Sequence, residues 1–403
     1  MKKRYNIQYL LALMFTLALV GCSNDDFLTT QSDEANVVSF SIGTDMPQVV
    51  SKARDGYRDW KAGDPTSFGA FGMYDRNYEN IDKLFRNQEV TRSGSAWTYS
   101  PAKYWADYTW CQAFDFFGYM PYMDADTSEP PAARNGVKFE QGGVGHENEY
   151  TLSFPVTLGD ADSDGKIDAV TSTASEVPLI CHAPVHKTVV GDVINYEMDQ
   201  VLTGFSLKFM LGTKMTALRD FVIKEVKIKG AENEMPYSGT VSRTYTYDPS
   251  NDSWSSGDVT WTGITNSTTA TEFTVPFVDH GETGGIYDGT NSTLRIGYSD
   301  PVETVADARQ WGNPFYAIPS ASFNPTIEVK YDVTVKDEDE NGTYITTRSN
   351  IVSTIKFKDD NFTTYTAAGA VAKVNPIVVQ IVPNYLYVLA DADQRIGYLI
   401  VKE

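Results

Sequence analysis

An acidic run in the middle of the chain has the spacing of a calcium-binding loop. The stretch DADSDGKID places carboxylates at the first, third, fifth and ninth positions of such a loop, with a glycine at the sixth. These carboxylates are Asp160, Asp162, Asp164 and Asp168. The twelfth position holds Thr171 where a bidentate glutamate normally completes the loop. The run is therefore either a calcium site, with Glu176 as the substitute ligand, or an acidic solvated turn.

A second stretch, CHAPVH, brings a cysteine and two histidines close together in the sequence. Zinc needs three or four converging ligands, and no residue nearby completes such a set. Strand alternation would also place Cys181 and His182 on opposite faces, so we favour a structural role. Cys111 and Cys181 either form one disulfide in an exported protein or remain two separate buried thiols.

Signatures of catalysis are absent from the sequence. It contains no G-x-S-x-G, no H-E-x-x-H and no phosphate-binding glycine loop. The formal net charge of −20 provides no general attraction for nucleic acid or for an anionic lipid surface. We therefore expect a protein that is not an enzyme, has no nucleic-acid partner, and has no cofactor unless the acidic run binds calcium.

The elements that must position these residues are predicted to be strands. The segment TIEVKYDVTVKDE alternates apolar and polar side chains over its whole length, which is the period of a half-buried strand. Similar short runs recur along the chain between turn residues, and long apolar stretches of helical period are absent. The sequence therefore predicts an all-β fold. A chain of 403 residues is long for one sandwich, so we expect two in series, over residues 36–195 and 196–403.

The first 22 residues have the features of an export signal. A basic start precedes an apolar run that is short for a membrane span, which needs about 20 residues. The ending, LVGC, resembles the lipobox of bacterial lipoproteins, which implies cleavage after residue 21 and acylation of Cys22. The alternative is an ordinary secretory signal followed by an incidental cysteine.

The segment behind Cys22 indicates where the protein is delivered. Its acidic residues, in SNDDFL, resemble the surface-export signal of Bacteroidetes lipoproteins. We therefore expect a signal peptide over residues 1–21, a flexible acidic tether over 22–35, and a surface-exposed lipoprotein of the cell outer membrane.

Three aromatic blocks point to a family. FGAFGMYD, WTYSPAKYWAD and FDFFGYMPY follow one another, and the last two contain W-x-Y-x-P-x-K-Y-W and F-F-x-Y-x-P-Y. In motif and spacing they resemble the fimbrillin family, the type V pilins and their Mfa-like relatives. VINYEMDQVLTGFSLKF and FYAIPSASFNPTIEVKYDVTV resemble later segments of that family. Gln200 departs from the His-Ala-Leu of many relatives, and the subgroup (stalk, anchor, tip or non-polymerising relative) stays open. The resemblance implies two tandem transthyretin-like β-sandwich domains after a lipoprotein signal peptide.

The resemblance also implies a mode of assembly. An Arg-specific or trypsin-like protease removes the first strand of the precursor, and a strand of another subunit then fills the groove. NVVSFSIG is the candidate for the removable strand, and the bond after Arg54 is the preferred cleavage site. The last twenty residues, 384–403, are the candidate donor, with alternating side chains at Tyr385, Tyr387, Leu389, Ile396, Tyr398 and Ile400. Alternation fits equally well an ordinary strand that closes the C-terminal sandwich.

These expectations combine into one functional prediction. The chain is expected to be a structural or accessory subunit of a surface fimbria or pilus, to serve adhesion, and to assemble by protease-triggered β-strand exchange. Its partners would be other fimbrial subunits, the outer membrane through the lipid anchor, and the protease. The alternative is a monomeric surface lipoprotein that binds a glycan or a host ligand through exposed aromatic side chains.

Overall fold

The structure is a computed structural model of the 403-residue chain. It describes residues 37–44, 58–59, 66–123, 136–158, 177–188, 190–211, 219–277, 287–288, 291–297, 307–312, 314–320, 322–335, 346–356, 374–382 and 398–402.

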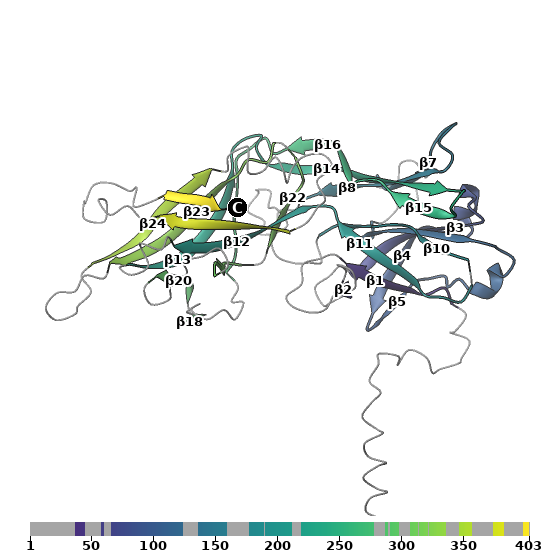
Figure 1. The fold of residues 1–403 in the computed structure, drawn as a ribbon, viewed down its shortest axis with the longest axis horizontal. Coiled ribbons are helices and arrows are strands. Elements are labelled where there is room, and N and C mark those ends of the chain that lie inside the picture. The colour runs from purple at the N-terminus through teal and green to yellow at the C-terminus, as the bar shows by residue number, and fades with distance from the viewer. Residues whose placement is uncertain are drawn as a thin grey trace, which may run out of the picture.

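The described residues form an elongated molecule made almost entirely of strands (Figure 1). In these ranges the helical elements are two short 3₁₀ turns, η2 (Tyr78–Asp82) and η3 (Trp105–Tyr108). The all-β fold predicted from apolar alternation is therefore confirmed. No helix in the described ranges is long and apolar enough to cross a membrane.

The largest sheet, which we call sheet A, lies in the N-terminal half. Its strands run in the order β2-β1-β11-β9-β6-β3-β4-β5, and β10 also pairs with β6. Their bounds are β1 (Phe40–Thr44), β2 (Arg58–Asp59), β3 (Ser67–Tyr74), β4 (Phe85–Ser93), β5 (Ala96–Thr98), β6 (Phe114–Met120), β9 (Leu179–Cys181), β10 (Val185–Lys187) and β11 (Ile194–Gln200).

A second sheet, sheet B, contains strands from both halves of the sequence. Its order is β15-β14-β8-β7, with β16 also paired to β14. The bounds are β7 (Lys138–Gln141), β8 (Glu149–Thr157), β14 (Pro236–Asp248), β15 (Ser253–Ser256) and β16 (Thr260–Asn266). Strand β14 pairs with β8 from Ser238 opposite Thr157 to Thr246 opposite Glu149. Strands β14 to β16 come after residue 195, the predicted domain boundary, yet they belong to the same sheet as β7 and β8. This pairing does not test where the boundary lies.

Sheets A and B pack through an aromatic core. The ring of Phe117 on β6 lies 4.6 Å from that of Phe139 on β7 and 5.3 Å from that of Tyr245 on β14. Tyr119 stacks on Phe154 of β8 at 4.9 Å. Because large aromatic side chains bury the most apolar surface, these contacts join the two sheets into one sandwich.

The C-terminal half forms two further sheets. Sheet C has the order β21-β12-β25-β26, with β22 on β12, and sheet D has the order β17-β13-β23-β24, with β20 on β13. The bounds in sheet C are β12 (Thr203–Leu211), β21 (Arg309–Gln310), β22 (Phe315–Ala317), β25 (Val374–Val382) and β26 (Tyr398–Lys402). Those in sheet D are β13 (Arg219–Gly230), β17 (Thr271–Thr274), β20 (Leu294–Gly297), β23 (Thr326–Val335) and β24 (Thr346–Lys356). A separate two-stranded ribbon pairs β18 (Tyr287–Asp288) with β19 (Asn291–Ser292).

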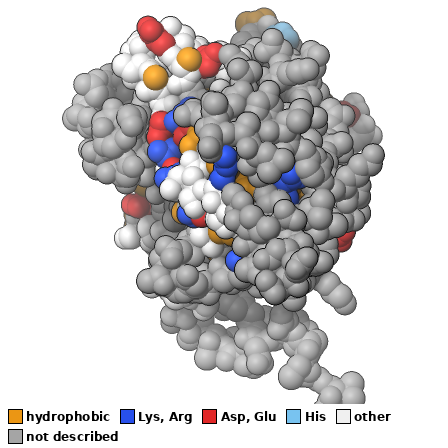
Figure 2. All heavy atoms as spheres, turned by 90° about the vertical axis from the view of Figure 1, so that its left-hand side faces the viewer, with side chains coloured by type: hydrophobic (Ala, Val, Ile, Leu, Met, Phe, Trp, Pro, Cys, Tyr) orange, Lys and Arg blue, Asp and Glu red, His pale blue; other side chains and the backbone are white. Residues whose placement is uncertain are grey.

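The C-terminal sheets also enclose an apolar core and present charges outside. Phe273 of sheet D contacts Phe315 of sheet C at 5.6 Å, and Trp311 Nε1 donates a hydrogen bond to the Val275 carbonyl at 2.7 Å. Acidic and basic side chains lie near one another on the end of the molecule that faces left in Figure 1 (Figure 2). Cross-strand ion pairs on sheet D join Lys227 to Glu272 and Lys229 to Glu328, each at 2.7 Å.

The two sandwiches share one local arrangement. In the N-terminal half, β1 runs parallel to β11 and carries the antiparallel strand β2 on its outer side. In the C-terminal half, β25 runs parallel to β12 and carries the antiparallel strand β26. The other strand pairs of the described residues are antiparallel. β1 and β25 therefore hold equivalent places in their sheets.

Candidate functional site

Strand β1 and the two residues directly before it place alternate side chains in the core of the N-terminal sandwich. Val38, Phe40 and Ile42 are 0%, 6% and 5% exposed, whereas Ser39 and Ser41 between them are only partly buried. The alternation predicted for NVVSFSIG thus corresponds to one buried face and one polar face. The strand is short, but half of its side chains belong to the core.

Phe40 lies in a pocket of aromatic rings. Its ring contacts those of Phe68 at 5.3 Å, Phe85 at 5.6 Å and Tyr99 at 5.7 Å, and it stacks on Tyr196 at 6.0 Å. These four rings come from β3, β4, the segment after β5, and β11. The pocket around Phe40 is therefore formed entirely by elements other than β1.

Hydrogen bonds also hold Val38 and Ser39, the two residues that directly precede β1. Ile194 N donates to the Ser39 carbonyl at 2.8 Å, and Val38 N donates to the Lys103 carbonyl at 2.9 Å. The Tyr99 hydroxyl donates to the Val38 carbonyl at 2.8 Å, and burial raises the pKa of this phenol, so it stays protonated. Removing this segment together with β1 would leave Ile194 N and the other main-chain groups of β11 that pair with β1 without their partners.

The outer edge of β1 is lightly covered within the described residues. Strand β2 pairs there with Gly43 and Thr44, and an isolated bridge joins Val37 to Tyr104. On the inner edge, by contrast, all five residues of β1 pair with β11. The strand therefore sits between a continuous partner on one side and a short one on the other, which is the position of a strand near a sheet edge.

Most of the residues predicted to act lie outside the described ranges. These are the lipidation site Cys22, the cleavage site Arg54, the carboxylates Asp160, Asp162, Asp164 and Asp168, and the donor positions Tyr385, Tyr387, Leu389 and Ile396. The remaining donor positions, Tyr398 and Ile400, belong to β26, where they pair with Val382 and Gln380 of β25. The roles predicted for all of these residues stay predictions.

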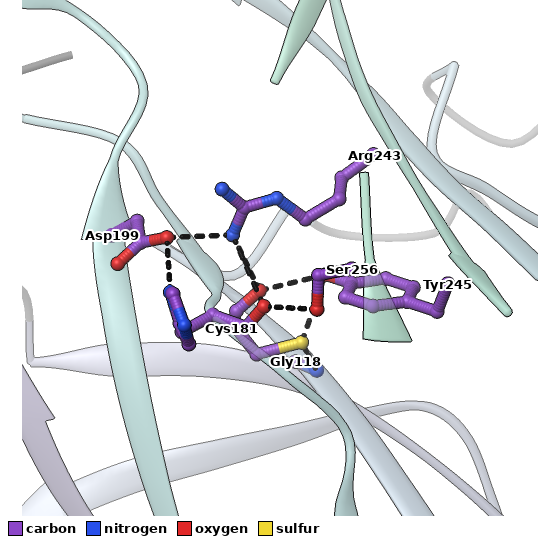
Figure 3. Close-up of polar contacts among 7 residues, drawn as sticks. Gly118, Cys181, Asp199, Arg243, Tyr245 and Ser256 are labelled. Atoms are coloured by element: carbon purple, nitrogen blue, oxygen red, sulfur yellow. Dashed lines mark hydrogen bonds and ion pairs between the residues drawn. The ribbon is translucent and has the colours of Figure 1, made fainter. Parts of the chain in front are cut away.

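A buried polar cluster joins sheet A to sheet B (Figure 3). Arg243 of β14 donates through Nη1 to Asp199 Oδ2 on β11 at 2.7 Å and to the Cys181 carbonyl at 2.9 Å. The Tyr245 hydroxyl donates to the same carbonyl at 2.8 Å and lies 3.0 Å from Cys181 Sγ. Ser256 Oγ contacts the neighbouring carbonyl of His182 at 2.5 Å. The cluster ties β14 and β15 to strands of the opposite sheet.

The two cysteines of the described ranges are separate buried thiols, which resolves the alternatives left by the sequence. Burial raises the pKa of the Cys181 thiol, and it also raises that of Cys111 to about 11. Because the thiolate is the reactive form, neither group is prepared for nucleophilic attack.

The histidines of CHAPVH each contact a different carboxylate. His182 Nδ1 lies 2.9 Å from Asp199 Oδ2, and His186 Nδ1 lies 2.7 Å from Asp115 Oδ1. Cys181 is fully buried while the His182 side chain is about half exposed, as strand alternation predicted. In the described ranges, no group of three His, Cys, Asp or Glu side chains is placed to hold a metal ion.

Sequence reasoning missed the residues that line the β1 pocket and the acidic partner of His186. Asp115 is fully buried although it is charged. Its signal was present in the sequence, since FDFFGYM places one carboxylate inside an otherwise apolar run. A buried carboxylate needs a paired donor, but the sequence alone does not identify which donor.

Comparison with known proteins gives structural neighbours only. No family model and no curated protein matches the chain. Among solved structures, a fimbrial protein from Bacteroides vulgatus is 12% identical, with 91% of this chain and 98% of that chain covered at a TM-score of 0.44. A "putative cell adhesion protein" from Bacteroides uniformis is 12% identical, with 92% and 98% covered at a TM-score of 0.37.

Proposed function

We propose that the protein is a surface fimbrial subunit that assembles by strand exchange, with β1 as the strand that is removed. The observation that carries this proposal is the placement of β1. It is a short strand near a sheet edge, yet it fills an aromatic pocket with Phe40 and pairs along its full length with β11. A chain segment in that position is a replaceable part of the core.

The free energy of burying the side chains supports stable binding of a replacement strand. Burying three apolar side chains contributes about 1.5–3 kcal/mol each, so Val38, Phe40 and Ile42 together contribute about 5–9 kcal/mol before the cost of ordering the strand. An emptied groove would also expose main-chain donors and acceptors of β11, which attract another strand. A neighbour's strand with similar alternation regains both contributions.

The position of β26 supports the identity of the donor. Strands β25 and β26 have the same relation to β12 that β1 and β2 have to β11. Strand β26 is the last strand in the order of sheet C, so it can leave its own sheet without separating β25 from β12 and can enter the groove of the next subunit. We place the donor within residues 384–403, with Tyr398 and Ile400 among the inserted side chains.

The proposal also includes the delivery of the precursor to the membrane and the protease cleavage that starts assembly. The acylated Cys22 would anchor the precursor in the outer membrane, and an Arg-specific or trypsin-like protease would cut after Arg54, which separates β1 from the body of the protein. Other fimbrial subunits are then the partners, and adhesion is the role of the assembled fibre.

The test uses the full chain purified in detergent and treated with an Arg-specific protease. We expect cleavage after Arg54, followed by a ladder of oligomers on a denaturing gel run without heating. The variant Arg54→Gln should remain monomeric, whereas Lys52→Gln, a matched control two residues away, should assemble normally.

A peptide competitor distinguishes strand exchange from other association. A synthetic peptide of residues 36–44, added with the protease, should occupy the emptied groove and suppress the ladder. The same peptide with Phe40→Asp and Ile42→Asp should have no effect. Unchanged assembly in the presence of the native peptide would contradict the proposal.

A further inference from the structure

A fully buried carboxylate connects the two sheets of the N-terminal sandwich. Asp115 lies on β6 of sheet A and is 0% exposed. Its Oδ1 accepts hydrogen bonds from Nδ1 of His186 on β10 and from Nε1 of Trp254 on β15, each at 2.7 Å. Since β10 belongs to sheet A and β15 to sheet B, this one oxygen joins both sheets.

The charge of Asp115 favours the imidazolium form of His186. Within the described residues, His186 is the ion-pair partner of this carboxylate. Leaving a buried carboxylate without a compensating charge is costly, so the proton on the imidazole is held more tightly. The hydrogen bond to Asp115 raises the pKa of His186 and outweighs burial, which lowers it; Asp252 adds to the rise and Arg76 opposes it.

The proton that His186 gains and loses must be the one on Nε2. A carboxylate only accepts, so His186 Nδ1 carries a proton toward Asp115 in both charge states. His186 Nε2 is buried without a hydrogen-bond partner and lies 3.8 Å from Asp252 Oδ1. When it is protonated, Nε2 presents a positive N–H to this carboxylate. When it is neutral, it presents a lone pair, and the attraction is lost.

Asp252 belongs to the turn between β14 and β15, so it transmits this change to sheet B. It also forms an ion pair with Arg76 and accepts a hydrogen bond from the Tyr247 hydroxyl at 2.6 Å. The Arg76 guanidinium lies 4.5 Å from the centre of the Tyr247 ring. These contacts hold Asp252 near His186 in both of its charge states.

Three other titratable groups around the pair have pKa values that are shifted away from neutral pH. Tyr150 of β8 has its pKa raised to about 12 by burial, and burial likewise raises the pKa of Tyr247. The hydrogen bond from Tyr247 lowers the pKa of Asp252, so that carboxylate stays ionised. Lys187, next to His186 on β10, pairs with Asp192 at 3.6 Å. With the two tyrosines neutral and Asp252 ionised, His186 is the group among these four that loses its charge as the pH rises from mildly acidic values.

We propose that His186 is a proton-controlled latch that holds the β14–β15 hairpin of sheet B against sheet A. A raised folded-state pKa means that the extra stability is fully present below about pH 6.5, the ordinary pKa of histidine, and is lost as pH rises through the folded-state pKa. The β14–β15 hairpin is therefore held more tightly against sheet A in a mildly acidic medium than in an alkaline one.

A double-mutant cycle on the full chain tests the latch. The four proteins are the wild type, His186→Asn, Asp252→Asn and the double variant. Asparagine at 186 keeps a donor near the position of Nδ1 and has no group at Nε2. Amide hydrogen exchange of residues 246–258 is measured at pH 6.0 and 8.5, with variants compared only at equal pH so that intrinsic exchange rates cancel.

The latch predicts coupling that depends on pH. Protection of the hairpin should show about threefold coupling between positions 186 and 252 at pH 6.0, a typical size for a partly exposed pair, and none at pH 8.5. The control pair His146→Asn and Asp252→Asn should show no coupling at either pH, because His146 contacts Glu149 instead. Equal coupling at both pH values, or none at either, would overturn the proposal.

A second measurement tests the latch if the His186→Asn variant fails to fold. If His186→Asn is unfolded, the ratio of protection between the wild type and Asp252→Asn should shrink about threefold from pH 6.0 to 8.5, since the attraction between His186 and Asp252 is lost when the imidazole loses its proton. A constant ratio would equally overturn the latch.

Discussion

At the scale of single residues, the N-terminal sandwich depends on polar side chains that are buried and paired across its sheets. Arg243 is 7% exposed and reaches Asp199 and the carbonyl of Cys181 on the opposite sheet. Removing one member of such a pair leaves the other buried and poorly compensated, and that cost usually exceeds the gain from the pair itself.

Replacing Arg243 should therefore destabilise the protein strongly. We expect Arg243→Met to lower the free energy of unfolding by about 3–5 kcal/mol, measured by urea denaturation. Arg86→Met, which removes the exposed ion pair with Asp82, should cost less than about 1 kcal/mol. Adding Asp199→Asn to Arg243→Met should cost less than the sum of the two single changes; strict additivity would show that the pair is not coupled.

The thiols provide a second prediction at this scale. With a pKa of about 11, only about one Cys111 molecule in a thousand is a thiolate at pH 8, and burial protects Cys181 further. A chromogenic disulfide reagent should label both cysteines slowly in the folded chain and rapidly in 6 M guanidinium. Rapid labelling of the folded chain would contradict the buried positions of these side chains.

At the scale of elements, β1 lies one strand in from the end of sheet A, and alternate side chains of it belong to the core. Its parallel partner β11 lies about 150 residues later in the sequence, and its outer neighbour β2 contributes two residue pairs. The proposed exchange therefore breaks the pairing of β1 with β11 and these two pairs, and leaves the pairing among the other strands of sheet A in place.

A substitution that weakens the packing of β1 should lower the stability of the uncleaved precursor and leave the stability of the polymer unchanged. Phe40→Ala should lower the stability of the uncleaved chain by about 3–5 kcal/mol, because it empties the aromatic pocket. The fibre formed after cleavage should have the thermal resistance of the wild type, since the proposed exchange removes this residue. Ser39→Ala, on the polar face of the segment, is the matched control and should change neither. Loss of polymer stability in Phe40→Ala would count against removal of β1.

At the scale of the whole molecule, β14 joins the two sandwiches. It follows β13 of sheet D directly in the sequence, yet it pairs with β8 over nine residue positions and places Val241 and Tyr245 in the N-terminal core. The N-terminal sandwich is therefore completed by residues that come after the predicted boundary.

Two separately expressed halves should consequently associate. Residues 36–195 alone lack β14 to β16 and also residues 196–200 of β11, so they should not unfold cooperatively in urea. Co-expressed with residues 196–403, they should copurify as a complex through the pairing of β8 with β14. Val241→Asp in the second half should abolish copurification, whereas Thr262→Ala, on β16, should not. Cooperative unfolding of residues 36–195 alone would support two independent sandwiches.

The sequence by itself determined the class of fold and the faces of individual strands. Alternation in NVVSFSIG correctly predicted which side chains of the first strand are buried, and alternation around Cys181 correctly separated it from His182. Such patterns are local, because a strand's own residues decide which of its two faces is apolar.

Only the tertiary structure decided which strands pair and which polar groups meet. Nothing in β14 marks β8 as its partner, and nothing in CHAPVH marks Asp115 as the carboxylate that His186 contacts. Apolar alternation makes many pairings between strands acceptable, and the choice among them depends on how the whole set of side chains packs. The parallel alignment of β1 with β11, on which the proposed strand exchange rests, is a choice of this kind.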